Sequence, residues 1–287
     1  MPAGRPTAPV PISLAVTIRV PAFGVAVRRR TRSLSTVVPA VAAVILLGAT
    51  PATARPAGGT TPTGSITVSA AASLTEAFTA LGDRFERRNP RADVTFNFGS
   101  SSSLVSQIQA GAPADVFAAA DLATMDRLVA DGEVATTPTP FARNTMVIAV
   151  KPGNPEELTG VDDLADAGTI SLCGAAAPCG VYAARVLERA GVTVPERRIT
   201  RGADARATVG AVARGDAAAA IVYVTDVEAA GRSVAAVAIP AAQNVIAVYP
   251  IAPLAASSNR RLARAFVDFV TSPAGQRTLA AYGFLPA

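Results

Sequence analysis

Ser73 stands at the start of a helical pattern, directly after a strand-like stretch, and Glu76 follows it three residues later. This is the spacing of a capping box, in which a serine or threonine begins a helix. A helix start presents unpaired backbone N–H groups and a partial positive charge, so it binds anions readily. A second, serine-rich helix start follows at residues 100–103. Two polar, uncharged helix starts predict a site that holds an oxyanion rather than one that reacts with it.

Two more helix starts and one tyrosine share this character. Small or polar residues open helical patterns at 179–181 and 203–206, and Tyr223 ends an apolar, strand-like run. Ligands in open α/β sheets lie beyond the carboxyl ends of strands, so these positions can meet at one site. Each also has an ordinary alternative. Ser73 can be a plain N-cap, the serine run a loop, and Tyr223 a core aromatic residue with a satisfied hydroxyl.

The chain has no histidine, and Lys151 is its only lysine. Ser-His-Asp and Cys-His nucleophiles are therefore excluded, and the commonest zinc ligand is missing. Lys151 belongs to no Ser-x-x-Lys motif, so a serine–lysine nucleophile is unsupported as well. A serine hydrolase, the enzymatic alternative, would lack a base near Ser73 or Ser101.

Short apolar runs alternate with helical patterns after residue 65, which predicts an α/β fold. Strands are expected at 66–69, 93–98, 114–119, 145–150, 169–173, 218–224, 234–239 and 245–254. Helices are expected at 74–89, 104–110, 121–131, 162–167, 180–190, 205–214, 259–272 and 273–281. Turn-rich residues 136–140 precede the strong strand at 145–150, where we expect the chain to cross into a second lobe.

The first 57 residues differ from the rest of the chain. They carry seven arginines and no acidic residue, and an apolar run at 37–49 precedes small residues at 52–54. This order is typical of an export signal, with a retained signal anchor as the alternative. The remaining residues hold 19 basic and 21 acidic groups, a net charge of −2. The excess positive charge therefore belongs to the leader, and it gives no support for nucleic-acid binding.

The only two cysteines, Cys173 and Cys179, lie six positions apart. In an exported protein such a close pair favours a disulfide, with two reduced thiols as the alternative. A loop this short would contribute about 2–3 kcal/mol in the chain-entropy model. We expect its main effect to be stiffening of the loop before the next helix.

Several motifs together resemble the molybdate-binding proteins of ABC transporters. They are SAAASL at 69–74, FGSSSSL at 98–104, QIQAGAPADVF at 107–117, AAD at 119–121, PCGVYA at 178–183, IVYVTD at 221–226 and YGF at 282–284. The resemblance covers nearly all of residues 65–287, and the QIQAGAPAD string is its most specific part.

The resemblance implies a two-lobed periplasmic binding protein fold of type II, in which each lobe is a mixed sheet flanked by helices and a hinge joins the lobes. It implies an extension and signal peptide at 1–57, a first part of lobe 1 at 58–141, lobe 2 at 142–250 and a return segment of lobe 1 at 251–287. One tetrahedral oxyanion, molybdate or tungstate, would lie between the lobes, with no cofactor. Its ligands would be Ser73, Ser101, the backbone N–H groups of Cys179 and Ala205, and the hydroxyl of Tyr223.

The same resemblance implies a monomer, exported to the periplasm or cell-envelope space and soluble after signal cleavage, that delivers its ion to a membrane permease. Cys179 stands where some relatives have alanine, and Ala205 replaces a bulkier residue. Both changes are compatible with main-chain donors. We expect Asp115, Asp121 and Asp226 to cap backbone groups rather than touch the anion. The alternatives are a carrier of sulfate or another oxyanion, a serine hydrolase, and the effector domain of a transcription regulator.

Overall fold

The computed structural model describes residues 62–287. The leader predicted at 1–57 lies outside the described residues. Within the described part, none of the helices combines the length and apolar character that crossing a membrane requires.

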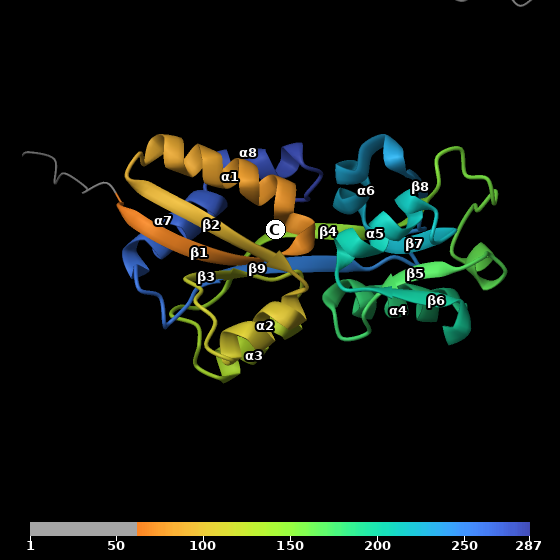
Figure 1. Cartoon of the computed structure of the whole chain (residues 1–287), viewed down its shortest axis with the longest axis horizontal. Coiled ribbons are helices and arrows are strands. Elements are labelled where there is room, and N and C mark those ends of the chain that lie inside the picture. The colour runs from red at the N-terminus through yellow and green to blue at the C-terminus, as the bar shows by residue number, and fades with distance from the viewer. Residues whose placement is uncertain (1–61) are drawn as a thin grey trace, which may run out of the picture. The chain divides into compact units, whose positions relative to one another are not determined.

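The first lobe is built on strands β1 (Gly64–Ala71), β2 (Ala92–Gly99) and β3 (Val116–Ala118). β1 lies between β2 and β3 and runs parallel to both. Five helices cover this sheet: α1 (Thr75–Arg88), α2 (Ser101–Gln109), α3 (Leu122–Ala130), α7 (Arg260–Thr271) and α8 (Pro273–Ala281). Figure 1 shows α1, α7 and α8 on one side of the sheet and α2 and α3 on the other.

The second lobe contains β5 (Ile170–Cys173), β6 (Ile199–Gly202), β7 (Ala219–Tyr223) and β8 (Ala235–Ala238). β5 runs parallel to β6 and β7, while β8 pairs with β4. Its helices are α4 (Pro178–Ala190), α5 (Ala205–Arg214) and α6 (Val224–Ala230), and short 3-10 turns lie at Asp162–Ala165, Glu196–Arg198 and Gly231–Ser233.

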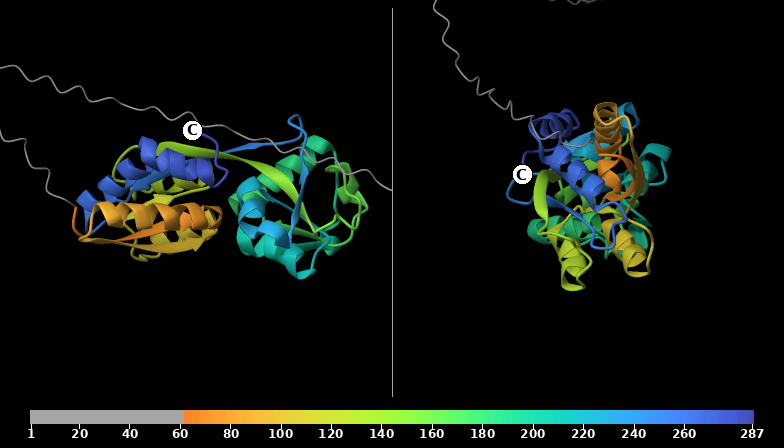
Figure 2. Two further views of the ribbon diagram at one scale, coloured as in Figure 1. Left: turned by 90° about the horizontal axis from the view of Figure 1, so that it is seen from above. Right: turned by 90° about the vertical axis from the view of Figure 1, so that its left-hand side faces the viewer.

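Two long antiparallel strands join the lobes: β4 (Thr139–Val150) and β9 (Ile246–Pro253). β9 pairs with β3 in the first lobe, and β4 pairs with β7 in the second, which gives the strand order β2-β1-β3-β9-β4-β7-β5-β6. The view from above in Figure 2 shows both strands spanning the space between the lobes. The predicted segment boundaries at 141/142 and 250/251 fall inside these strands.

One large apolar cluster includes residues of both lobes. In the first, Phe78, Phe85 and Phe266 pack edge to face with ring centroids 5.4–6.2 Å apart. Burying each such side chain contributes about 1.5–3 kcal/mol. The buried face of α1 is formed by Ala77, Phe78, Leu81, Gly82 and Phe85. In the second lobe, alanine and valine from β4, β7 and α5 form a separate cluster.

The predicted α/β class, with two lobes each built on a mixed sheet flanked by helices, is confirmed. Several details differ from the expectations, among them the helix expected at 162–167, which is a short 3-10 turn at Asp162–Ala165. β4 begins at Thr139, within the stretch expected to be a turn, and its register shifts between Pro140 and Ala142, where a bulge accommodates the proline. β6 and α6 were not expected. β6 is only half-buried and polar, and α6 continues directly from the apolar run of β7, so neither has a distinct pattern of its own.

Candidate functional site

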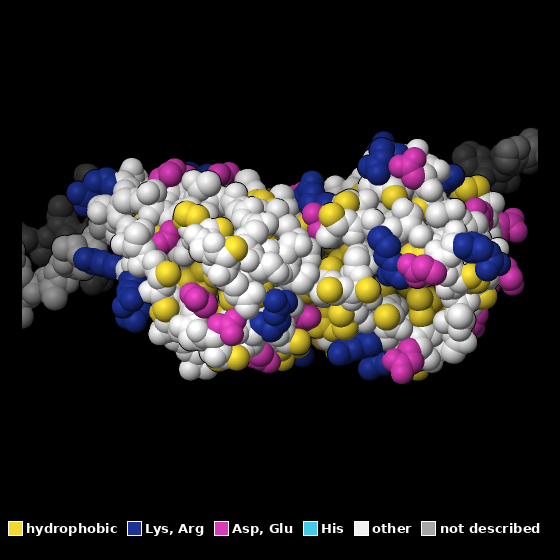
Figure 3. Space-filling model, turned by 60° about the horizontal axis from the view of Figure 1, so that its bottom comes forward, with side chains coloured by type: hydrophobic (Ala, Val, Ile, Leu, Met, Phe, Trp, Pro, Cys, Tyr) yellow, Lys and Arg dark blue, Asp and Glu magenta, His cyan; other side chains and the backbone are white. Residues whose placement is uncertain are grey.

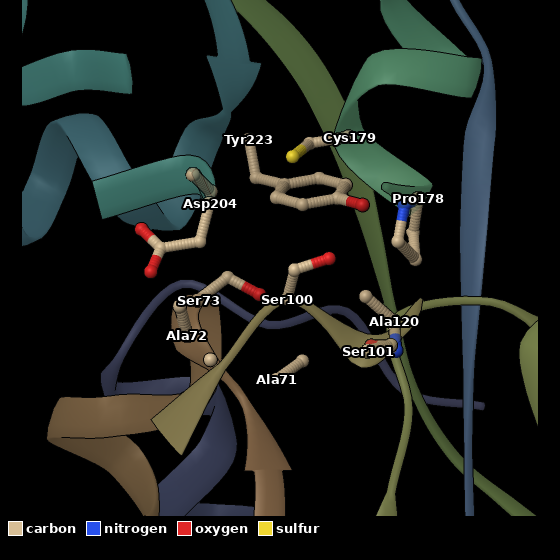
Figure 4. Close-up of a pocket in the computed structure, with 12 residues that line it drawn as sticks. Ala71, Ala72, Ser73, Ser100, Ser101, Ala120, Pro178, Cys179, Asp204 and Tyr223 are labelled. Carbon is tan, nitrogen blue, oxygen red and sulfur yellow. The ribbon is translucent and has the colours of Figure 1, made fainter. Parts of the chain in front are cut away.

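One small pocket lies where the two lobes face each other. The space open to the centre of a water-sized sphere is about 10 Å³, roughly the room that one water molecule needs. Figure 4 shows the side chains around it. Its lining residues come from both lobes: Ala71, Ala72, Ser73, Gly99, Ser100, Ser101, Ala120, Pro178, Cys179, Asp204, Ala205 and Tyr223. All five predicted site residues are among them.

Ser73 does not form the predicted capping box. It lies in a 3-10 turn, Ala72–Leu74, and α1 begins at Thr75 without a side-chain cap. Glu76 instead forms an ion pair with Arg206 on α5, across the gap between the lobes. The Ser73 hydroxyl is hydrogen-bonded to the hydroxyl of Tyr249, at 2.9 Å. Tertiary contacts therefore override the local capping signal.

The serine run is the start of α2. Ser100 is the N-cap and Ser101 the first helical residue, three positions earlier than the expected helix start. The Ser101 hydroxyl accepts a hydrogen bond from the backbone N–H of Ala120, at 3.0 Å. A hydroxyl has one proton and two acceptor sites, so Ser101 still has its proton to donate toward the pocket. The first-turn N–H groups of α2 have no partner within the helix.

The start of α4 contributes backbone N–H groups. Pro178 is the first helical residue and has no N–H, so Cys179 supplies the first donor of the helix. Cys179 is bonded to Cys173 at the end of β5, with a Cα–Cα distance of 5.8 Å. A Cβ added at Gly180 would lie 2.2 Å from the carbonyl oxygen of Gly174. Glycine and the disulfide together hold the helix start close to the end of β5.

The start of α5 is capped by Asp204, whose carboxylate accepts from the N–H of Ala207, at 2.9 Å. The cap leaves the N–H of Ala205 free of intrahelical partners. Asp204 also lines the pocket, and Figure 4 shows its carboxyl group pointing away from the hydroxyl of Tyr223. The charge of Asp204 therefore serves the helix rather than the pocket.

Tyr223 ends β7 and is 1% exposed. Its hydroxyl is one of two buried side-chain oxygens in the described part of the chain that have no hydrogen-bond partner. Burial raises the pKa of this phenol well above its ordinary value, with further contributions from neighbouring Tyr249 and Tyr182. The hydroxyl therefore keeps its proton and can donate it to an acceptor in the pocket.

The carboxylates near the pocket are occupied by backbone or hydroxyl donors, as expected. Asp121 accepts from the N–H of Thr124, Asp226 from the N–H of Tyr223, and Asp115 from the N–H of Thr67 and the hydroxyl of Ser257. Burial raises the pKa of Asp226 to about 7, and the nearby charges of Asp204 and Glu76 add to this effect. No lysine or arginine is among the lining residues.

The pocket can therefore offer N–H and O–H donors to an anion without a countercharge. Among residues 62–287, no group of three or more His, Cys, Asp or Glu side chains is arranged to hold a metal ion. The sequence did not reveal the apolar lining residues Ala71, Ala120 and Pro178, which carry no chemical signal. It also did not reveal Tyr249, whose alternating position in a strand is that of an ordinary core residue.

Comparisons with known proteins show which proteins the chain resembles. The family described as bacterial extracellular solute-binding proteins matches residues 66–285. The molybdate-binding protein ModA of Mycobacterium tuberculosis is 39% identical over 245 residues, which cover 85% of this chain and 93% of the relative. ModA of Escherichia coli is 31% identical over 231 residues, with 77% and 89% covered.

Two solved structures share the fold. The periplasmic molybdate-binding protein of Azotobacter vinelandii superposes with a TM-score of 0.68 at 21% identity, covering 77% of this chain and 99% of its own. The sulfate-binding protein SubI of Mycobacterium tuberculosis superposes with a TM-score of 0.68 at 22% identity, covering 78% of this chain and 87% of its own. At these identities the likeness concerns the fold alone.

Proposed function

The chain belongs to the family of bacterial extracellular solute-binding proteins, and we propose that it captures molybdate, and also tungstate, between its two lobes and delivers the ion to the permease of an ABC transporter. Relatives whose names state molybdate binding cover most of the chain at 31–39% identity. The proposed ligands are the hydroxyls of Ser73, Ser101 and Tyr223 and the backbone N–H groups of Cys179 and Ala205.

The observation that carries this proposal is the buried Tyr223 hydroxyl, which has no partner within the described residues. Leaving a buried hydroxyl unpaired costs about 1–3 kcal/mol. A bound oxyanion would remove that cost, because its oxygens accept hydrogen bonds. The hydroxyl lines the same pocket as the starts of α2, α4 and α5, where helix ends favour negative charge.

Size and chemistry favour a small tetrahedral dianion as the ligand. The pocket is small and is lined by residues of both lobes, which favours a compact guest over an extended one. Hydrogen bonds to a charged acceptor are the strong kind, so neutral donors suffice to hold a dianion. Sulfate presents the same charge and acceptor pattern, and a sulfate-binding protein shares the fold. We expect selectivity for the larger ion to come from the spacing of the donors, since a smaller ion would leave slack hydrogen bonds.

The remaining parts of the proposal concern where the protein acts. The leader at 1–57 directs export, and the protein acts as a monomer in the periplasm or cell-envelope space. The near-neutral charge after the leader fits a carrier of small ions. On the face shown in Figure 3, basic and acidic side chains are interspersed rather than gathered into one field. Closure of the lobes about β4 and β9 would shield the bound ion from water.

Calorimetric titration of residues 58–287 with molybdate, tungstate, sulfate and phosphate, each in a separate run, tests the proposal. We expect tight one-to-one binding of molybdate and tungstate and little heat from the other two. Tight binding of sulfate or phosphate in preference to molybdate would reassign the carrier. The absence of binding by all four ions would refute the oxyanion site.

Variants of the two serines test the location of the site. Ser73→Ala and Ser101→Ala should each weaken molybdate binding by about 1–3 kcal/mol, the range for a lost hydrogen bond to a charged partner. Ser106→Ala is a matched control, because that serine lies on the exposed side of α2 and bonds only its own helix. Unchanged affinity in both site variants would mean that the ion binds elsewhere.

A further inference from the structure

A chain of buried polar groups leads from the connecting strands to the pocket. Tyr249 on β9 bonds Ser73 at 2.9 Å, and the amide nitrogen of Asn144 on β4 lies 3.5 Å from the Tyr249 hydroxyl. The same nitrogen donates to the hydroxyl of Thr225, at 2.9 Å, at the start of α6 in the second lobe. Tyr249 is fully buried and Asn144 is 1% exposed, so bulk water does not compete for these bonds.

The orientation of the Asn144 amide determines the direction of each hydrogen bond in this series of polar groups. The amide oxygen of Asn144 accepts from the backbone N–H of Thr145, at 2.9 Å. This bond fixes the orientation of the amide, so the nitrogen is the atom that faces Thr225 and Tyr249. An amide NH₂ group only donates. The Tyr249 oxygen therefore faces a donor on the Asn144 side.

The proton of Tyr249 must then go to Ser73. Burial raises the pKa of Tyr249 far above its ordinary value, so the phenol stays protonated. With Tyr249 donating, the oxygen of Ser73 accepts, and the proton of Ser73 is left to point into the pocket. Reversing the bond would leave the Tyr249 proton buried beside an NH₂ group, and an unpaired buried donor is costly.

We propose that Asn144 is a positioning residue that acts through Tyr249 to fix Ser73 as a hydrogen-bond donor, so that the pocket accepts fully deprotonated oxyanions and disfavours those that carry a proton. The inference rests on the proposed oxyanion site. It explains how the pocket could distinguish two oxyanions that have the same size and charge. A protonated oxyanion must donate one hydrogen bond, and the Ser73 hydroxyl could accept it only at the cost of an unpaired proton. Ser101 is directed in the same way by the N–H of Ala120.

Sulfate and hydrogen phosphate form the matched pair of probes, since both are tetrahedral dianions and only the second carries a proton. Their dissociation constants are measured by displacement of molybdate at mildly alkaline pH, and the ratio of the two is the readout. Asn144→Asp places an acceptor beside Tyr249, which allows the chain to reverse. We expect hydrogen phosphate to gain roughly 5- to 100-fold relative to sulfate in this variant, the equivalent of one unpaired buried group.

Two comparisons separate this effect from a change in overall charge or packing. The added carboxylate repels both dianions alike, so it weakens each without altering the ratio. Tyr249→Phe combined with Asn144→Asp breaks the chain, and we expect the ratio to return to the wild-type value. An unchanged ratio in folded Asn144→Asp, or a shifted ratio that persists in the double variant, would overturn the proposal.

A second measurement covers the case in which Asn144→Asp does not fold. Neutron diffraction of the wild-type protein locates the deuterium of the Tyr249 hydroxyl directly. We expect it on the line to Ser73, and finding it directed elsewhere would refute the proposed direction of the chain. A failure of molybdate to bind the wild-type protein at all would instead refute the proposed function, and direct titration shows this separately from the ratio.

Discussion

Tyr223→Phe should change ligand affinity and fold stability in opposite directions. The substitution removes one oxygen from a side chain that is 1% exposed and leaves the ring packing against Tyr182 and Tyr249 in place. In the absence of ligand this oxygen has no partner within the described residues. Removing an unpaired buried hydroxyl relieves a cost of about 1–3 kcal/mol, so the ligand-free variant should be at least as stable as the wild type.

In the complex the same hydroxyl would donate to a charged acceptor. Such a bond contributes about 1.5–3 kcal/mol, so the variant should bind molybdate roughly 10- to 150-fold more weakly. Thermal unfolding with and without molybdate, combined with calorimetric titration, measures both effects on one sample. The stabilisation by saturating ligand should shrink by about 1.4 kcal/mol for each tenfold loss of affinity.

Tyr182→Phe is the matched control, because it removes a hydroxyl from a neighbouring tyrosine that does not line the pocket. We expect molybdate affinity to be unchanged in that variant. A Tyr223→Phe protein that is destabilised without ligand yet binds molybdate normally would refute the reasoning, because the hydroxyl would then have a structural partner and no role in binding.

Three further predictions concern the surroundings of the site. Burial raises the pKa of Asp226 to about 7, above about 3.9 in the unfolded chain. The native state therefore keeps a proton that the unfolded chain releases, and the free energy of unfolding should fall as pH rises from about 4 to about 7. Asp226→Asn should lack this fall, and parallel pH profiles of the two proteins in urea unfolding would contradict it. Reduction of the Cys173–Cys179 disulfide should lower the free energy of unfolding by about 2 kcal/mol. It should also weaken molybdate binding, because the start of α4 is released. Equal affinity with and without reductant would show that the disulfide does not hold the α4 start in place for binding. Arg206→Gln removes the ion pair between Arg206 and Glu76, whose side chains are 48% and 35% exposed, respectively. We therefore expect molybdate release, measured by stopped flow, to accelerate by less than about fivefold, and the effect to shrink at high salt. A larger effect that is independent of salt would argue against a surface ion pair.

The helix starts around the pocket could be predicted from the sequence because their signals are local. A proline or small residue after a strand, followed by an amphipathic pattern, indicates where α4 and α5 begin whatever the rest of the chain does. The starts of α4 and α5 are therefore found from neighbouring residues, whereas α2 begins earlier than expected. The choice of Ser101, Cys179 and Ala205 as ligands came from the family resemblance. Their meeting at one pocket was implied by the family resemblance, since spacing along the chain does not determine which helix starts converge.

The features of the site that could not be predicted from the sequence depend on long-range contacts. Ser73 and Glu76 have the spacing of a capping box, yet Ser73 bonds a tyrosine 176 positions away and Glu76 an arginine 130 positions away. Tyr249 lies in an apolar strand and has the alternation of a core residue, so no local pattern sets it apart. A residue whose partners come from other elements shows its role only once the fold brings them together.

The site also explains how acidic residues can surround a place meant for a dianion. Asp121, Asp204 and Asp226 each accept a backbone N–H at or beside a helix start. At such positions a carboxylate satisfies a donor that the helix leaves unpaired and opposes the partial positive charge of its end. For Asp204 the carboxylate points away from the pocket, while the free N–H groups of the same turn remain available to a ligand in the pocket.

Because no fixed cation lines the pocket, affinity would depend on the number and direction of neutral donors. Opening of the lobes would remove about half of these donors at once. A carrier that must release its ion to a permease benefits from this arrangement, because a single motion changes affinity without titrating any group.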